Sequence, residues 1–285
     1  MTKVAIITDS IACLTSDLVE RYGIGIIPIN FYSDGKVYHD WVDITPSQAY
    51  DLFLQDPKSF RTSAASPAYC LNVYREISKR ADQILCVTVS SKLSTVYNVA
   101  LGAKEQAAVE LPSVRIEVVD SQMATAGEGL IALAAARAAA EGKDLAEVRR
   151  AAEEVKQKVS VFVLLDTVRY VYRSGRIPKI AAYSASVLNI RPLLAISSGV
   201  VKFNGAVRNR AHGIDRILKI MRSKVGSKPV HVAVVHAYAL DEAKKLTERI
   251  AAEFNCAELW LAEFSPVMGY ACGTGALGVA FYPES

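Results

Sequence analysis

The sequence predicts an α/β protein made of two α/β domains. Short apolar runs rich in Val and Ile alternate with segments of helical periodicity, a pattern typical of helices between the strands of a largely parallel sheet. The 285 residues are enough for one large domain or two ordinary ones. Because 51% of the residues are hydrophobic and 22% charged, a disordered chain is excluded.

The first half of the chain combines expected strands with clear helix starts. Thr45 supplies an N-cap, Pro46 takes the first helical position and Gln48 completes a capping box. Ser66-Pro67 begins a further helix. The expected strands are residues 4–8, 24–32, 83–89 and 114–119.

Two consecutive helices, residues 124–141 and 144–158, separate the two halves of the chain. The second is charged and amphipathic, so we place the domain boundary at its end. This predicts an N-terminal α/β domain over residues 1–158 and a C-terminal α/β domain over residues 159–285. The expected strands of the second domain are residues 161–165, 193–196, 200–203, 231–236, 257–263 and 277–282.

Residues 264–283 carry no formal charge and are nominally long enough to span a bilayer. Pro266 and four glycines interrupt the stretch, whereas a spanning helix needs an unbroken apolar run. The first ten residues are too short for the apolar region of a signal peptide. We therefore expect no integral membrane segment and a cytoplasmic location.

The cysteines, histidines and net charge favour no cofactor, metal or nucleic acid. The five cysteines include no C-x-x-C pair, and most are expected to be small buried side chains. The four histidines are scattered along the chain. A net charge of +4 from dispersed basic residues is too mild to indicate nucleic-acid binding.

Gly273, Gly275 and Gly278 have the spacing of a dinucleotide-binding fingerprint. That motif needs a strand before it and a helix after it, but here an apparent strand follows. We expect instead a glycine-rich turn packed against a ligand or the backbone.

Clusters of hydroxyl side chains precede several expected helices, and most of them follow an apolar strand. In open α/β sheets, ligands bind at the carboxyl ends of strands, and Ser and Thr can donate hydrogen bonds to an anion. Each cluster alone is explained by N-capping, but four together favour a small-anion site. The clusters are Thr8-Asp9-Ser10, Thr62-Ser63 with Ser66, Thr88-Val89-Ser90-Ser91 with Ser94-Thr95, and Asp120-Ser121.

No serine has a base visible in the sequence, so an independent hydrolase or kinase is weakly supported. The densest basic segments are residues 173–179 and 208–210. They are equally compatible with solvated loops and with contact to an acidic partner or a phosphate.

A series of short segments in this order resembles the DegV family of bacterial fatty-acid-binding proteins, and the resemblance covers essentially the whole chain. The order of the segments carries it more than any one of them. They are Ile7-Thr8-Asp9-Ser10, residues 42–46, Thr62-Ser63 with Ser66-Pro67, residues 89–94, Val119-Asp120-Ser121, Gly175-Arg176-Ile177, residues 188–192, Val207-Arg208, Pro266-Val267 and residues 273–278.

The resemblance implies a lipid-binding tunnel at the interface of the two domains. The tunnel would hold one long-chain fatty acid as the only ligand, with Thr62 and Ser94 on its carboxylate and Ser63 beside them. The chain itself would not be catalytic. A separate fatty-acid kinase would convert the bound acid to an acyl phosphate for phospholipid synthesis, and Arg208 matches an arginine linked to that kinase.

This sequence departs from the family pattern at the expected carboxylate site. Ala271 stands where the family often has a ligand-binding histidine, Lys92 replaces a usual glycine, and Ala64-Ala65 replace Gln-Pro. Lys92 either reaches the ligand's head group or is solvated.

The energies indicate which function these changes affect. Burying a C16 tail contributes roughly 12 kcal/mol before association costs. One hydrogen bond to a charged group contributes about 1.5–3 kcal/mol. Binding should therefore survive Ala271, while carboxylate positioning for phosphoryl transfer is put in question. Two alternatives stay open: an enzyme or carrier for a small phosphorylated or carboxylated metabolite, and a carrier of a different amphiphile.

Overall fold

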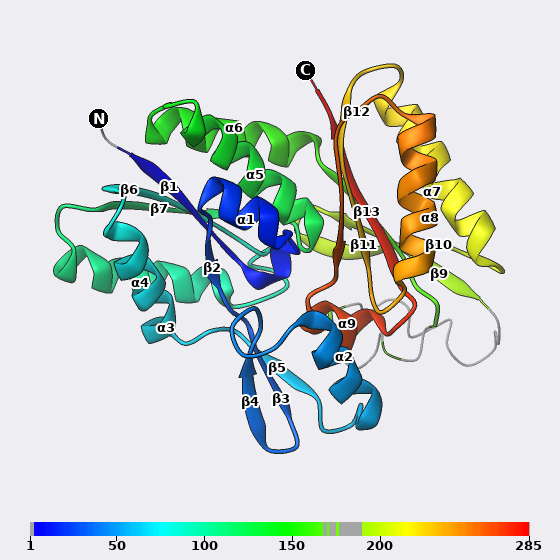
Figure 1. The fold of residues 1–285 in the computed structure, drawn as a ribbon, viewed down its shortest axis with the longest axis horizontal. Helices are drawn as coiled ribbons and strands as arrows, with labels where there is room; N and C mark the ends of the chain where they lie inside the picture. The colour runs from blue at the N-terminus through cyan, green and yellow to red at the C-terminus, as the bar shows by residue number, and fades with distance from the viewer. Residues whose placement is uncertain (1–2, 168–169, 171–174, 177–189, 285) are drawn as a thin grey trace.

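The computed structural model describes residues 3–167, 170, 175–176 and 190–284. Two large sheets lie side by side, each with helices packed on it, and a small hairpin sheet extends below them (Figure 1). The strands of the first large sheet lie within residues 4–120 and those of the second within residues 160–283. The α/β fold is confirmed.

The first large sheet is entirely parallel, with the order β2-β1-β6-β7. Helices cover both of its faces, so all six residues of β1 are buried. Its strands are β1 (Val4–Asp9), β2 (Gly25–Ile27), β6 (Gln83–Thr88) and β7 (Arg115–Asp120). One face packs on α3 (Pro67–Ser78) and α4 (Val96–Glu110), and the other on α5 (Ala126–Ala140) and α6 (Leu145–Lys158); α1 (Ser16–Tyr22) follows β1 in the chain.

Local capping explains where several of these helices begin. The predicted capping box at the start of α2 (Pro46–Gln55) is present, with Thr45 and Gln48 bonded to each other's backbone N–H groups. Ser66 caps α3 as expected. Asp144 and Glu147 form a second capping box at the start of α6.

The single strand expected over residues 24–32 is wrong. Pro28 has no backbone N–H to donate to a ladder, and the chain changes sheet on either side of it. Upstream lies β2, and downstream β3 (Asn30–Ser33) pairs with β4 (Lys36–His39) and β5 (Arg61–Ser63) in an antiparallel sheet. This sheet brings residues 61–63 beside the two large sheets.

The second large sheet has the order β10-β9-β8-β13-β11-β12, and only β11 and β12 pair in parallel. The expectation of a largely parallel sheet is therefore wrong for this half. A tight turn at Ser198 and Gly199 joins β9 to β10, and a connection that short permits only antiparallel strands. The strands are β8 (Ser160–Leu164), β9 (Arg191–Ser197), β10 (Val200–Val207), β11 (Val230–His236), β12 (Cys256–Glu263) and β13 (Leu277–Pro283). Its helices are α7 (Arg210–Val225) and α8 (Leu240–Glu253).

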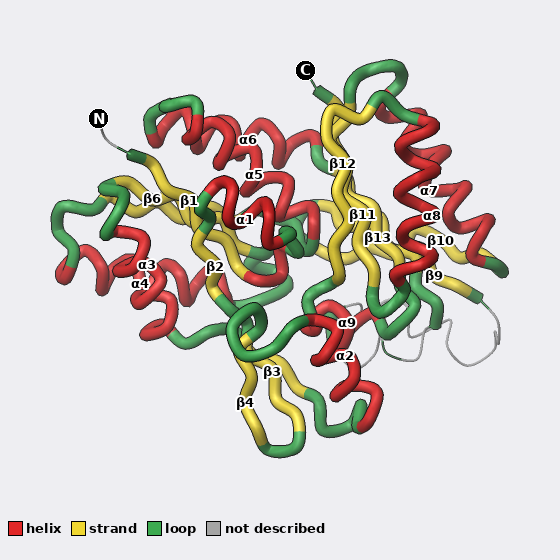
Figure 2. The backbone as a smooth tube through the Cα atoms, in the orientation of Figure 1, coloured by secondary structure: helices red, strands yellow, loops and turns green. Residues whose placement is uncertain are grey.

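Helix α5 lies between the two large sheets (Figure 2) and contacts β1 and β6 on one side and β8, β11 and β13 on the other. Two glycines allow this close approach. A β-carbon on Gly127 would stand 2.4 Å from Val161 in β8, and one on Gly129 would stand 2.5 Å from the backbone oxygen of Ala12. Because α5 packs on both sheets, the boundary near residue 158 stays a prediction.

The uncharged segment 264–283 folds as a short helix, α9 (Pro266–Cys272), a turn and then β13. Among the residues that the structure describes, no helix has both the length and the apolar run that crossing a membrane requires. All five cysteines are free thiols, and all but Cys256 are buried, as expected. The described part of the chain contains no group of three or more metal-ligating side chains.

Candidate ligand-binding site

A cavity of about 500 Å³ lies between the first large sheet and one face of the second. This volume falls within the range of small-molecule sites. Five parts of the fold line it: the loops after the parallel strands, β5, the inner face of β8–β10, α9 and Arg176.

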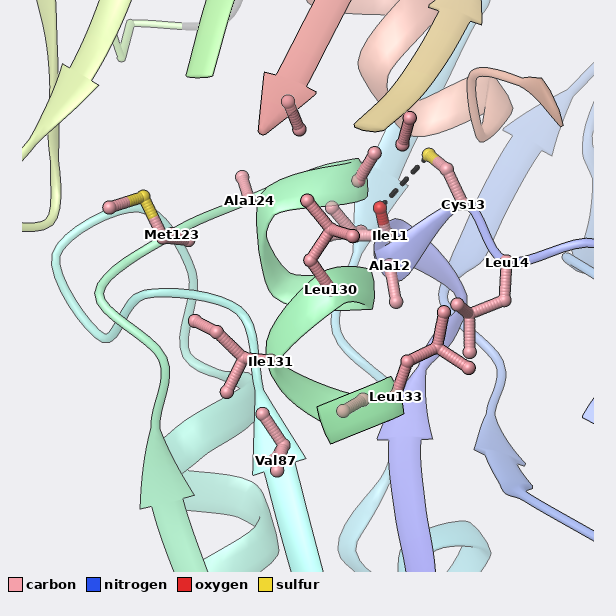
Figure 3. Packing of buried hydrophobic residues seen from close by; sticks show 14 of the residues in the cluster. Ile11, Ala12, Cys13, Leu14, Val87, Met123, Ala124, Leu130, Ile131 and Leu133 are labelled. Atoms are coloured by element: carbon pink, nitrogen blue, oxygen red, sulfur yellow. Dashed lines mark hydrogen bonds between the residues drawn. The ribbon is translucent and has the colours of Figure 1, made fainter. Parts of the chain in front are cut away.

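The first wall comes from the carboxyl ends of the parallel strands. Ile11 follows β1, Val89 follows β6 and Ala124 follows β7, and each is almost fully buried. Figure 3 shows Ile11 against α5, with Ala124 just before the start of that helix. Ligands in α/β sheets bind at this edge, where the strand order reverses.

The second wall is one face of the mixed sheet. Val163 pairs with Leu194, and Ile196 pairs with Val201, so these four aliphatic side chains form a continuous patch across three strands. Alternate residues of a strand share a face, which places Leu194 and Ile196 together. The patch is the right chemistry for an acyl chain.

The third wall is α9, which contributes Val267, Met268, Ala271 and Cys272. Buried hydrogen bonds hold the start of this segment on the first half of the protein. Ser265 Oγ donates to Asp40 Oδ2 at 2.6 Å, and Tyr50 donates to the backbone oxygen of Phe264 at 3.2 Å. Burial raises the pKa of the Cys272 thiol to about 12, so it is an inert part of the wall.

All four residues assigned to ligand binding from the sequence, Thr62, Ser63, Ser94 and Ala271, line this one cavity. Thr62 lies on β5 opposite Phe31 of β3, and Ser94 lies in the loop after β6. The structure thus brings together residues up to 209 positions apart in the sequence.

The hydroxyl groups at this site differ in their bonding. Ser63 Oγ donates to the backbone oxygen of Ala64 at 3.2 Å and lies 3.2 Å from the Tyr32 hydroxyl, so it is engaged within the protein. Ser94 Oγ accepts the backbone N–H of Val96 at 3.4 Å, which leaves its own O–H able to donate. Ser94 therefore suits an anionic head group better than Ser63 does.

N-capping is confirmed for some members of the hydroxyl clusters, whereas an anion site at the other members stays a prediction. Ser66 is an ordinary N-cap of α3, and Asp9 caps the short 3₁₀ helix Ser10–Ala12. Ser91, Ser94 and Thr62 line the cavity. Of these three, Ser91 donates a hydrogen bond to Asp120 at 2.6 Å.

Lys92 is exposed to solvent and also belongs to the cavity lining. Its Nζ donates to the backbone oxygen of Ser198 at 3.0 Å, and the neighbouring Ser90 Oγ donates to the backbone oxygen of Gly199 at 2.8 Å. The loop after β6 is thereby fastened to the turn between β9 and β10, across the two halves of the protein.

Arg176 also lines the cavity, and its Nε donates to the backbone oxygen of Leu93 at 3.2 Å. Sequence reasoning placed it only within a basic segment, although Gly175-Arg176-Ile177 was one of the segments carrying the family resemblance. Residues 173–174 and 177–179 of that basic segment, and 188–189 of another matching segment, lie outside the described residues.

Arg208 lies outside the cavity, exposed in the connection from β10 to α7. Its backbone oxygen accepts a hydrogen bond from Arg191 Nη1 at 3.2 Å, and Arg191 also pairs with Asp166 at 2.9 Å. Partial burial raises the pKa of Asp166, but hydrogen bonds from Arg210 and Arg191 bring it below its ordinary value. Arg208 thus sits on a braced surface loop.

The glycine-rich segment is a turn between α9 and β13, as expected, but its glycines pack against side chains and not against backbone. Gly273 and Gly275 have φ angles of 77° and 85°, in the region that favours glycine. A β-carbon on Gly273 would stand 2.2 Å from the Tyr170 ring, so the turn packs closely on a side chain. Since a strand follows, the dinucleotide fingerprint does not apply.

Comparison with known proteins gives one consistent result. A model of the DegV family, described as uncharacterised, matches residues 3–284. A DegV domain-containing protein of Clostridium perfringens is 31% identical over 283 residues, which is 99% of each chain. The structure of a DegV family protein from Thermus thermophilus, described as fatty-acid binding, is 28% identical, covers 99% of this chain and all of its own, and has a TM-score of 0.89.

The crystal structure of DegV from Bacillus subtilis, described as a fatty-acid-binding protein, superimposes over the whole of both chains with a TM-score of 0.90. At 24% identity this likeness shows the fold.

Proposed function

The chain belongs to the DegV family, and from that premise we propose that it binds one long-chain fatty acid in the cavity between its two large sheets. The observation that carries the proposal is the composition of the cavity lining. Apolar side chains form three walls, and the hydroxyls of Thr62 and Ser94 belong to the same lining. The fatty-acid binding described for the Thermus thermophilus relative supports the same ligand class.

The energetics agree with a ligand held mainly by its tail. A C16 chain contributes roughly 12 kcal/mol of apolar burial before the costs of association. The head group contributes less, about 1.5–3 kcal/mol for each hydrogen bond to a carboxylate. Thr62 and Ser94 would then orient the acid and contribute less to its affinity than the tail does.

Mass spectrometry of the purified, denatured protein tests the ligand directly. We expect a stoichiometric long-chain fatty acid, and we expect added fatty acid to raise the melting temperature of the delipidated protein. If neither is observed, the lipid-binding proposal fails. Thr62→Val and Ser94→Ala should each weaken fatty-acid binding by about tenfold or more. Neither substitution should weaken binding of the fatty alcohol of equal length as much.

We further propose that the protein is not itself catalytic and presents the carboxylate to a separate fatty-acid kinase, which forms the acyl phosphate used in phospholipid synthesis. The exposed position of Arg208, on a loop braced by Arg191, is compatible with a partner surface. Arg208→Glu should reduce acyl-phosphate formation with the cognate kinase and leave lipid affinity unchanged. Lys219→Glu, an equal charge change on the exposed side of α7, is the control. Equal turnover by both variants would refute the partner role.

An enzyme for a small polar metabolite is the less favoured candidate, because such a substrate would leave the three apolar walls of the cavity uncovered. A carrier of a different amphiphile is compatible with the same walls, and the mass spectrum distinguishes it from a fatty-acid carrier. A cytoplasmic location stays a prediction.

A further inference from the structure

Two buried acids, Asp9 and Glu128, lie in contact beneath the cavity. Asp9 ends β1 and Glu128 lies in the first turn of α5. Neither residue is exposed to solvent, and each carboxyl group lies close enough to shift the pKa of the other. Two ionised carboxylates in contact in a buried site would repel strongly, so the pair needs a cation or a proton.

Asp9 uses both of its oxygens as acceptors. Oδ1 accepts the backbone N–H of Ile11 at 3.0 Å, and Oδ2 accepts the backbone N–H of Val89 at 2.9 Å. Ile11 and Val89 are two of the residues in the first wall of the cavity. A single carboxylate therefore ties together two loops whose side chains would contact the ligand.

Glu128 has the bonding of the protonated partner. Its Oε1 accepts a hydrogen bond from Thr8 at 3.0 Å. Its Oε2 is buried and accepts no hydrogen bond from any described residue. An acceptor-only carboxylate would leave this atom unsatisfied, whereas a carboxylic acid can donate from it to Asp9.

The surroundings supply no compensating cation among the described residues. None of the ion pairs found there includes Asp9 or Glu128. The other titratable groups that interact electrostatically with Asp9 or Glu128 are acids: Asp40, Cys13, Cys70 and Cys86. Burial raises the pKa of Glu128 well above its ordinary value, and the charge of Asp9 raises it further. Burial raises the pKa of Asp9 only to about 6, since the N–H groups of Val89 and Ile11 and the side chain of Glu128 favour its charged form.

We propose that Glu128 keeps a proton, which it donates to Asp9, and that the resulting pair with one negative charge positions Ile11 and Val89 as walls of the lipid site. Asp9 and Glu128 are positioning residues in this scheme, since neither lines the cavity. The scheme rests on the proposed lipid binding. It predicts that the two acids respond oppositely to replacement by their amides.

The experiment compares Glu128→Gln with Asp9→Asn, using binding of a long-chain fatty acid to the delipidated protein. Gln reproduces a protonated acid, because its amide can donate to Asp9 while its oxygen accepts from Thr8, so affinity should stay within about twofold of wild type. Asn directs an NH₂ group at one of two backbone donors, so affinity should fall by about tenfold or more. Asp82→Asn is the matched control. Asp82 also accepts a backbone N–H, that of Lys3, but at the amino-terminal ends of β1 and β6, away from the cavity.

Infrared spectroscopy at pH 7 provides a measurement that a purely structural role would not change. The wild-type protein should show the C=O band of a buried protonated carboxyl group, and Glu128→Gln should remove that band. A band that persists in Glu128→Gln overturns the proposal, as does a Glu128→Gln variant that folds but loses binding. If wild type binds no fatty acid, the proposed function fails, while the infrared result still decides where the proton lies.

Discussion

The α-carbon of Gly129 faces the backbone oxygen of Ala12 so closely that a β-carbon on Gly129 would stand 2.5 Å from it. Figure 3 shows Ala12 and its neighbours lying against α5. Because the opposing atom is backbone, it cannot move aside as a flexible side chain would. We expect Gly129→Ala to lower the free energy of unfolding by about 1–3 kcal/mol, measured by urea denaturation.

The control for this substitution is Gly102→Ala in α4. A β-carbon on Gly102 would meet no atom within 4 Å, and a helical glycine replaced without strain gains up to about 1 kcal/mol of stability. The two variants should therefore move the unfolding midpoint in opposite directions. Equal shifts would contradict the close contact between α5 and the loop after β1.

A second prediction concerns pH and Asp40, which is fully buried and accepts a hydrogen bond from Ser265. Burial raises the pKa of Asp40 from 3.8 to about 6. A carboxyl group whose pKa is higher in the folded state than in the unfolded state stabilises the fold at pH values below its unfolded-state pKa. This stabilisation is lost as the pH rises through the folded-state pKa. Ionisation of Asp40 should therefore lower the free energy of unfolding by about 2 kcal/mol between pH 4 and pH 6.

Asp40→Asn removes this titration, because the amide keeps an acceptor for Ser265 and carries no charge. Its unfolding free energy, measured in urea at several pH values, should fall less steeply than that of wild type from pH 4 to pH 6. Parallel curves for the two proteins would show that Asp40 does not titrate in this range.

A third prediction concerns Lys92, whose Nζ donates to the backbone oxygen of Ser198. The residue is exposed, so the bond should contribute at most about 1 kcal/mol. Lys92→Met keeps most of the aliphatic stem, and we expect a small loss of stability with fatty-acid affinity unchanged. A selective loss of affinity for the acid over the alcohol of equal length would instead place the ammonium on the head group.

The sequence predicted the elements whose signals are local. Capping residues located the start of α2 and α3, and apolar runs located β1 and β6. The division of residues 24–32 between two sheets depends on the strands with which each part pairs. The apolar pattern alone predicts one strand, and only Pro28 indicates a break. Strand direction in the second sheet is likewise a tertiary property, because β13 enters between β8 and β11 from the far end of the chain.

The candidate site likewise combines residues that the sequence indicated with contacts that only the tertiary fold creates. Thr62 and Ser94 were found through a family resemblance, and their presence in one cavity is geometric information that no local pattern contains. The contact of Lys92 with Ser198 could not be predicted, because it joins the loop after β6 to a hairpin turn of the second sheet. The pairing of Asp9 with Glu128 depends on how α5 packs against β1.

The last prediction concerns Ala271, which lines the cavity on α9 at the position where the family resemblance led us to expect a histidine. In Ala271→His an imidazole would add a hydrogen-bond donor beside the hydroxyls, and a charged one below its ordinary pKa of about 6.5. Isothermal titration should show fatty-acid affinity rising by about tenfold at pH 6 and by less at pH 8. Affinity for the fatty alcohol of equal length should hardly change, because the alcohol has no negative charge. Ala271→Leu adds comparable bulk without a donor and should not distinguish acid from alcohol. An Ala271→His variant that treats the two ligands alike would show that the carboxylate lies elsewhere in the cavity.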